Sequence, residues 1–297
     1  MKRFFALSRT RHGILDLAAP GFVALLWLGR FPEWRIFLLS VFTAFAGYTA
    51  IYALNDLAGI AVDKEKFRGG INPGYLIEAS QYRHPLAQNM VSIRGGLLWF
   101  GAWFTAALIG SYLLNPAIIV ILIAAAILEV IYCLLLKVTC LRTFIGGMVK
   151  SAGPVAAVFA MDGNPAFLQL LLVFAWVFFW EIGGQNVPSD WNDTVEDKRV
   201  NAKTIPLQLG KRKAGLIILF ALGLTVTLSL FLPQVSPLSL GQTFSLASAT
   251  AGVFLLLKPA YELNTQKEGR LAAKLFDNAS YYPLAQLTII SIFVLLQ

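Results

Sequence analysis

The sequence DWNDTVED, residues 190–197, follows a long apolar segment, and NDLAGIAVD, residues 55–63, stands at the end of another. In the later stretch the aspartates occupy positions i, i+3 and i+7, a spacing that places them on one face of a helix. In the earlier stretch Asp56 and Asp63 keep the i and i+7 positions, and Gly59 occupies i+3. Acidic residues are costly at membrane depth and usually mark a functional site there. Two such clusters facing each other could bind Mg²⁺, and the ion could bind a diphosphate.

The composition around these clusters is that of a membrane protein. The chain has 297 residues, of which 57% are hydrophobic and 13% are charged, whereas soluble domains carry about 25% charged residues. Apolar runs of about twenty residues recur along the chain and leave no large soluble domain. We therefore expect one integral membrane domain over residues 1–297, all-helical, with nine transmembrane helices. The spans are predicted at 14–31, 36–57, 92–113, 115–136, 143–161, 166–186, 214–233, 240–258 and 279–296.

The basic residues predict the orientation of these spans. The amino-terminal tail and the loops after even-numbered spans hold all of the 24 basic residues except Arg30, Arg35 and Lys150. By the positive-inside rule this side is cytoplasmic, and both aspartate clusters lie on it, in the two longest loops. We expect a multi-pass protein of a bacterial or archaeal cell membrane. The net charge of +8 follows from this topology and from anionic lipid headgroups, and no nucleic-acid motif is present.

Other metal and redox chemistry finds no support in the sequence. Cys133 and Cys140 fall near the cytoplasmic ends of two spans, where we expect reduced thiols. Two cysteines and two histidines in unrelated contexts give no zinc, haem or iron–sulfur pattern.

Each aspartate cluster also has a purely structural interpretation. The second could be a solvated acidic helix start, where aspartate suits the helix dipole. In the first, Asn55 and Asp56 could cap a loop, and Asp63 could be ordinary solvated helix surface. The recurrence of the pattern on the same side of the membrane favours the functional interpretation.

Basic side chains near the clusters could bind phosphate groups. Arg83, Lys137 and Lys203 lie in the cytoplasmic loops, and such cations stabilise a leaving diphosphate. Positive-inside topology alone explains most of them. Within the spans, Lys150 could meet an anionic acceptor, or it could pair with Glu181 as a structural bridge.

Taken together, these residues resemble the UbiA-type intramembrane prenyltransferases over nearly the whole chain. Four features carry the resemblance: NDLAGIAVD at 55–63, DWNDTVED at 190–197 with KTIP at 203–206, Tyr132 with Lys137, and RHPL at 83–86. Two positions depart from the family pattern. Gly59 replaces the middle acid of the first motif, and Asn201 stands where the second motif usually has glycine.

The resemblance implies a ring of helices around a central cavity that opens laterally toward lipid. It implies that Mg²⁺ bridges both motifs to an isoprenyl diphosphate, whose ionisation gives an allylic carbocation for an electron-rich acceptor to attack. The expected metal-binding and catalytic residues are Asp56, Asp63, Asp190, Asp193 and Asp197. The expected diphosphate-binding residues are Asn55, Arg83, Tyr132, Lys137, Asn186 and Lys203, and Lys150 is the candidate for contact with the acceptor.

We therefore expect Mg²⁺-dependent transfer of an isoprenyl group from a polyprenyl diphosphate to an aromatic or lipid acceptor, as in quinone or prenyl-lipid biosynthesis. We expect membrane lipid around the protein and no obligate protein partner. A terpene cyclase or diphosphate lyase on the same fold would need no acceptor. A secondary transporter also carries intramembrane charges, but its site lies near the membrane midplane. These acids cluster at the cytoplasmic ends of spans, which favours an enzyme.

Overall fold

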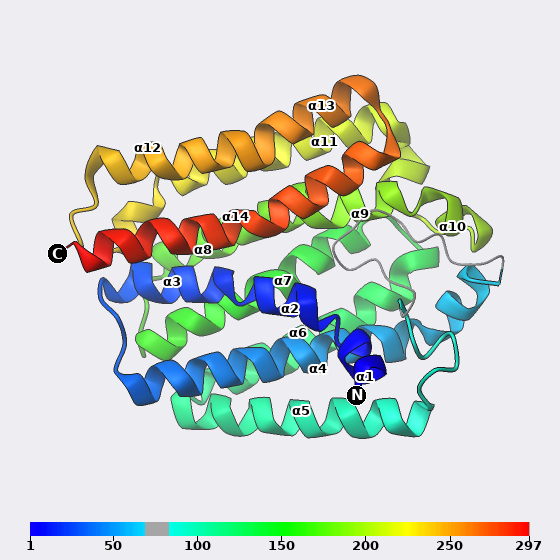
Figure 1. Ribbon diagram of the computed structural model, residues 1–297, viewed down its shortest axis with the longest axis horizontal. Coiled ribbons are helices and arrows are strands. Elements are labelled where there is room, and N and C mark those ends of the chain that lie inside the picture. The colour runs from blue at the N-terminus through cyan, green and yellow to red at the C-terminus, as the bar shows by residue number, and fades with distance from the viewer. Residues whose placement is uncertain (69–82, 297) are drawn as a thin grey trace.

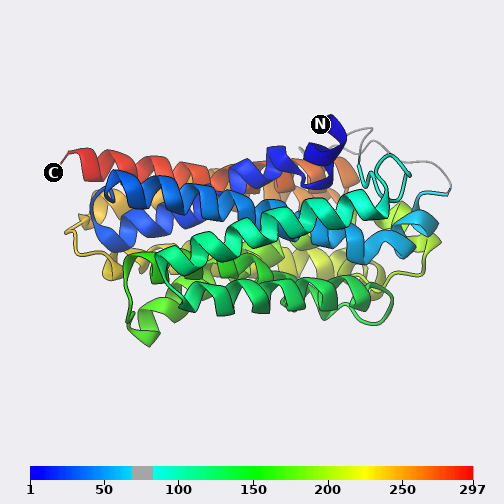
Figure 2. The same cartoon turned by 90° about the horizontal axis from the view of Figure 1, so that it is seen from below.

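The chain is a bundle of long helices. The computed structural model describes residues 1–68 and 83–296, and within these ranges it contains helices and no strands. Figure 1 shows the long helices lying side by side along one axis, and Figure 2 shows the same arrangement from below. The prediction of an all-helical membrane protein is confirmed.

Eight helical stretches of the described chain are long and apolar enough to cross a membrane. They are α4 (Trp34–Lys66), α5 (Ile93–Leu114), α6 (Ala117–Leu134) with η1 (Leu135–Lys137), α7 (Arg142–Met161), α8 (Phe167–Trp180) continuing through η2 (Glu181–Asn186) and α9 (Val187–Asn192), α11 (Ile205–Ser229), α12 (Gly241–Gly252) continuing through η4 (Val253–Leu257) and α13 (Lys258–Gln266), and α14 (Gly269–Leu295). Besides α2 and α3, which form the first predicted span, three short helices lie outside these stretches: α1 (Lys2–Leu7), α10 (Thr194–Arg199) and η3 (Leu232–Val235).

The first predicted span, residues 14–31, is built differently from the others. It consists of two shorter helices, α2 (Thr10–Asp16) and α3 (Ala18–Leu28), which lie end to end in Figure 1. Pro20 has no backbone N–H to donate to the carbonyl of Asp16 four residues earlier, which explains why α2 ends there. The break places Asp16 inside the bundle at the end of a helix.

Several helices extend beyond their predicted spans, because polar residues can continue a helix past the hydrocarbon region. α4 runs to Lys66 rather than ending at 57, α11 begins at Ile205 rather than 214, and α14 begins at Gly269 rather than 279. The prediction that both aspartate clusters lie in loops is therefore wrong. Asp56 and Asp63 lie on α4, and the second cluster continues directly from α8.

The π-helical segment η2 packs tightly against its neighbours, and glycine makes this possible. A Cβ atom on Gly183 would come within 2.8 Å of Leu222 Cγ on α11, and one on Gly184 within 2.8 Å of Ala279 Cβ on α14. Gln185 then donates from Nε2 to the carbonyl of Phe276 at 3.1 Å. Segments of π-helix occur frequently at functional sites, and this one leads directly into the second cluster.

A cavity of about 760 Å³ lies along α4 and α7. Its lining residues on α4 run from Phe37 to Lys66, a helical length of about 44 Å. Along α7 the wall is formed by small residues, among them Gly153, Ala156 and Ala160, which leave the space open. The cavity therefore connects an apolar interior with the end of the bundle that carries the aspartates.

Candidate active site

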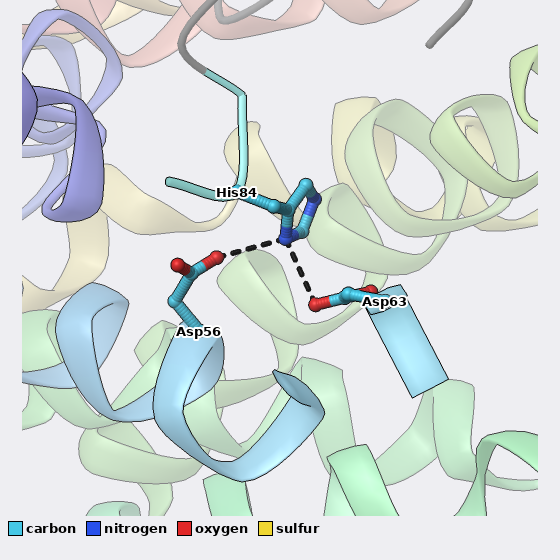
Figure 3. Close-up of side chains that lie close together, drawn as sticks. All are labelled: Asp56, Asp63 and His84. Atoms are coloured by element: carbon cyan, nitrogen blue, oxygen red, sulfur yellow. Dashed lines mark ion pairs between the residues drawn. The ribbon is translucent and has the colours of Figure 1, made fainter. Parts of the chain in front are cut away.

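The first arm of the site consists of Asp56 and Asp63, both buried on α4. His84 points between them from the segment before α5, as Figure 3 shows. Its Nδ1 lies 2.8 Å from Asp56 Oδ1 and 2.9 Å from Asp63 Oδ2. The backbone N–H of Leu86 donates to the other oxygen of Asp56 at 3.4 Å. The two carboxylates thus share one partner instead of facing solvent.

The local environment makes His84 a cation in this arrangement. Burial lowers the pKa of the imidazole, but the carboxylates of Asp63 and Asp56 outweigh burial and raise the pKa to about 9. The side chain packs against the ring of Phe67, with ring centroids 5.2 Å apart. At neutral pH His84 therefore adds one positive charge beside the two carboxylates of the first arm.

The second arm consists of Asp190, Asp193 and Asp197, which are all buried. The helix predicted to carry them on one face is interrupted once. α9 ends at Asn192, Asp193 adopts φ −89° and ψ 6°, and α10 begins at Thr194. The interruption is local, because the backbone N–H of Asp193 still donates to the carbonyl of Ser189 and that of Asp197 to the carbonyl of Asp193. Figures 1 and 2 both place α10 beside the end of α4, which brings the two arms together.

Asp190 belongs to a buried network that includes two predicted site residues. Arg142, at the start of α7, reaches Asp190 Oδ1 from Nη2 at 2.6 Å. The guanidinium also stacks over the ring of Tyr132, 4.4 Å from its centroid. Asn186 donates from Nδ2 to the hydroxyl of Tyr132 at 3.0 Å. The predicted residues Tyr132 and Asn186 are thus brought to the acids.

Lys66 and Arg83 connect the two arms. Lys66 Nζ, at the end of α4, lies 2.7 Å from Asp197 Oδ1 and 3.7 Å from Asp193 Oδ2. Arg83, next to His84, forms an ion pair with Asp193. Burial raises the pKa of Asp193, but Arg83 and Lys66 outweigh burial and hold the pKa at about 2. Burial raises the pKa of Asp197, and Lys66 offsets only part of that effect.

This donor set fits a divalent cation. Asp63, Asp190 and Asp193 line one end of the cavity, and Asp56 and Asp197 contact His84 and Lys66, which line it too. Within the described part of the chain, Asp190 Oδ2 is buried and accepts no hydrogen bond, although buried oxygens are normally satisfied. Carboxylate oxygens are the ligands that Mg²⁺ prefers. The basic side chains paired with these acids occupy the space that a bound metal ion would take.

The remaining predicted residues fall into two groups. Asn55 lines the cavity and bonds to Glu129 on α6, while Arg9 Nη2 donates to Asn55 Oδ1 at 3.1 Å. Lys137 instead pairs with Glu65 at 2.7 Å on the surface, where these side chains are 39% and 43% exposed. Lys203 does not line the cavity. The structure therefore places Asn55 on the cavity wall but leaves Lys137 and Lys203 apart from the cavity.

Lys150 lines the cavity, and its ion pair is with Asp16 rather than with Glu181. Its Nζ lies 2.6 Å from Asp16 Oδ2 and 3.2 Å from the hydroxyl of Tyr52. Tyr52 also donates to the same carboxylate. The structural bridge between Lys150 and Glu181 that the sequence left open is replaced by a bridge to the end of α2.

Four residues of the site escaped the sequence analysis: Lys66, His84, Glu129 and Arg142. Glu129 carried a usable signal, because it is a lone acid inside a strongly apolar span. Lys66 and Arg142 were counted only as topological charges. Nothing in the local sequence distinguishes them, since their partners lie in distant segments.

Comparison with known proteins establishes the fold and the family. Digeranylgeranylglyceryl phosphate synthase of Methanococcoides burtonii is 24% identical over 277 residues, which cover 92% of this chain and 88% of that protein. The apo structure of a UbiA homologue from Aeropyrum pernix matches with a TM-score of 0.74 and 18% identity, over 95% of this chain and 98% of the other. A UbiA homologue from Archaeoglobus fulgidus bound to GPP and Mg²⁺ matches with a TM-score of 0.68 and 14% identity, over 97% and 99%. The UbiA prenyltransferase family model matches residues 17–284, nearly the whole chain, and the protein therefore belongs to this family.

Proposed function

We propose that the protein transfers an isoprenyl group from a polyprenyl diphosphate to a lipophilic acceptor, with Mg²⁺ held between the two arms. The observation that carries this proposal is the convergence of five buried aspartates at one end of a long, largely apolar cavity. The family assignment supports the reaction class. The homologue from Archaeoglobus fulgidus, whose structure contains GPP and Mg²⁺, supports the substrate and the ion.

In this proposal Asp56, Asp63, Asp190, Asp193 and Asp197 hold the metal. When bound, Mg²⁺ neutralises charge on the diphosphate and so helps it leave. Each of these carboxylates is now paired with a basic side chain of the same chain. With these carboxylates bound to the ion, Lys66, Arg83 and Arg142 would be available to bind the oxygens of the diphosphate.

The cavity would hold the isoprenyl chain. The wall formed by α4 and α7 below the aspartates consists mainly of small and aliphatic side chains. A hydrocarbon chain can therefore pack against most of it without burying unpaired polar groups. Exclusion of water from the same space protects a reactive intermediate from hydrolysis. Tyr132 and Asn186 lie at the boundary between the acids and this apolar wall, where we propose that they position the diphosphate end of the substrate.

We propose that the polar group of the acceptor binds near Lys150. Lys150 is eight residues along α7 from Arg142, which places it about 12 Å deeper in the bundle. The Lys150–Asp16–Tyr52 cluster is a polar site within an apolar wall. The relative from Methanococcoides burtonii, a digeranylgeranylglyceryl phosphate synthase, favours a glyceryl phosphate lipid over a quinone-type aromatic as the acceptor class. Lys150→Met should then raise the KM for the acceptor and leave the KM for the prenyl diphosphate within about twofold; equal changes in both would contradict this placement.

Diphosphate release by the purified protein in lipid nanodiscs tests the reaction. Prenyl diphosphates of increasing chain length are supplied with or without Mg²⁺, and with hydroxybenzoates, naphthoates or prenylated glyceryl phosphates. We expect release that requires both Mg²⁺ and a glyceryl phosphate acceptor. Release with Mg²⁺ alone would instead identify a cyclase or lyase. Cation-driven uptake into liposomes without any release would identify a transporter.

The orientation in the membrane is part of the same proposal. The basic residues gather at the end of the bundle that carries the aspartates, so we place this end and the amino terminus in the cytoplasm. A membrane-impermeant biotin reagent on intact cells should leave a cysteine introduced at Lys2 unlabelled and should label one introduced at Gly163.

A further inference from the structure

The first arm contains a nitrogen donor as well as two carboxylates. His84 Nδ1, an oxygen of Asp56 and an oxygen of Asp63 all lie within 4.8 Å of one another (Figure 3). An ion with ligand bonds of about 2.1 Å has neighbouring ligand atoms about 3 Å apart and opposite ones about 4.2 Å apart. The distances of 2.8 and 2.9 Å from Nδ1 to the two carboxylates are close to the shorter of these spacings. The three atoms therefore have the dimensions of part of a metal coordination shell.

Position 59 explains why a donor from another segment is needed here. A Cβ atom built on Gly59 would lie 3.0 Å from Asp63 Oδ2, so a side chain at this position would face the first arm. The UbiA-type motif that this stretch resembles has an acid at this position, and this chain has none. His84 reaches the same carboxylates from the segment before α5 and brings the number of donor side chains back to three.

The imidazole and one of the carboxylates are fixed in place by their surroundings. The His84 side chain is only 9% exposed and packs against Phe67. Asp56 accepts a hydrogen bond from Leu86 on the oxygen that faces away from the histidine. Contacts of this kind orient metal ligands and are normally needed for tight binding.

We propose that His84 is a metal ligand in this protein and replaces the acid that Gly59 omits. The first arm is then a mixed nitrogen–oxygen site, whereas the second arm offers carboxylate oxygens alone. Imidazole strengthens the binding of ions such as Co²⁺ and Zn²⁺, while carboxylates suit Mg²⁺ and Mn²⁺. Binding requires the unprotonated nitrogen, so the ion takes the place of the proton on Nδ1. The proposal rests on the proposed function only in placing a divalent ion at this arm.

Electron spin echo spectroscopy of the Mn²⁺-loaded protein tests for the bond directly, because it detects a nitrogen nucleus bound to the ion. The full chain is measured in nanodiscs, with Mn²⁺ alone and with added inorganic diphosphate. We expect nitrogen modulation in the wild-type protein. Labelling the histidines with ¹⁵N should change this signal, and the test needs no substitution. His12 is the other of the two histidines in the chain, so His12→Ala is the matched control for His84→Ala.

Metal affinities supply a second readout. In His84→Ala the Kd for Co²⁺ should rise by at least about 10-fold to 100-fold, because loss of a group that only supports a ligand already costs this much. The Kd for Mg²⁺ should rise much less, and His12→Ala should change neither. Absence of nitrogen modulation under both conditions, its retention in His84→Ala, or equal losses for Co²⁺ and Mg²⁺ would overturn the proposal. In that case the imidazole only offsets the charge of Asp56 and Asp63.

These outcomes are separable from those of the proposed function. Nitrogen modulation without diphosphate release would remove the prenyl-transfer proposal and keep the ligand assignment. Mg²⁺-dependent release without nitrogen modulation would do the reverse.

Discussion

The two aspartate arms share a spacing in the sequence and differ in their chemistry. The first is carried by one continuous helix, and its carboxylates are bridged by His84. The second is broken at Asp193, and its carboxylates are paired with arginine and lysine. An imidazole can itself bind a metal, whereas a guanidinium or ammonium group has no lone pair to offer and must move away. In the proposed metal-bound protein, the first arm can therefore keep its basic partner, whereas the second must release its partners.

The arms are also physically linked. Lys66 lies on the same helix as the first arm but binds Asp197 of the second. Arg83 adjoins His84 and binds Asp193. A substitution in either arm should consequently alter the charge balance of the other arm.

The largest effect is expected in the second arm. Asp193→Asn and Asp197→Asn should each lower turnover by more than about 100-fold, because each removes one of the three carboxylates of this arm that are proposed to hold the metal. Diphosphate release at saturating substrate measures this, with size-exclusion chromatography to verify a monodisperse protein. Glu268→Gln, an exposed acid paired with Arg270, is the control. Wild-type rates in either aspartate variant would exclude the second arm from metal binding.

The Arg142–Asp190 pair should have the largest effect on stability. Both side chains are at most 8% exposed, and loss of one partner of a buried pair costs about 3–5 kcal/mol. Arg142→Met should therefore lower the unfolding temperature measured in chelator, and the double variant with Asp190→Asn should recover part of the loss. Mg²⁺ should stabilise Arg142→Met more than the wild type, since no cation has to leave Asp190. Equal stabilisation would mean that Asp190 does not contact the ion.

Gly59→Asp tests the first arm with a smaller expected effect. The new carboxylate would face Asp63 and restore a third oxygen donor, so the Mg²⁺ affinity should rise by up to about tenfold. Gly59→Ala, which adds bulk without a charge, is the control and should not raise the affinity. Calorimetric titration of Mg²⁺ without prenyl diphosphate measures both variants. A folded Gly59→Asp protein with weaker Mg²⁺ binding would show that position 59 lies outside the coordination shell.

The sequence predicted those features that depend on local patterns. Apolar runs located most of the long helices, and the recurring aspartates located the end of the bundle that holds the candidate site. The sequence marked Asn201 as a departure from the glycine of the motif without predicting its conformation, and the residue adopts φ 54°, a left-handed conformation that asparagine tolerates better than most residues. A few neighbouring residues determine such features.

The features that the sequence did not predict depend on distant segments. The break at Asp193 and the extension of α4 to Lys66 decide which acids face each other. The pairing of Arg142 with Asp190 joins residues 48 positions apart, and that of Arg83 with Asp193 joins residues 110 positions apart. A basic residue in a cytoplasmic loop satisfies the positive-inside rule whether or not it also reaches the site. Charge counting could therefore not separate Lys66 from Lys137.

Lys137 offers the smallest expected effect and the sharpest contrast with Lys66. Its pair with Glu65 is about 40% exposed, and exposed ion pairs contribute at most about 1 kcal/mol. Lys137→Ala should therefore change the KM for the prenyl diphosphate by less than about twofold, whereas Lys66→Met, which removes the buried partner of Asp197, should change it much more. Steady-state kinetics on both variants, with the unfolding temperature as a check on folding, measures this contrast. A tenfold rise in KM for Lys137→Ala would show that Lys137 leaves Glu65 to bind the diphosphate. The motif-based prediction that Lys137 binds the diphosphate would then hold, and the ion pair with Glu65 would break when substrate binds.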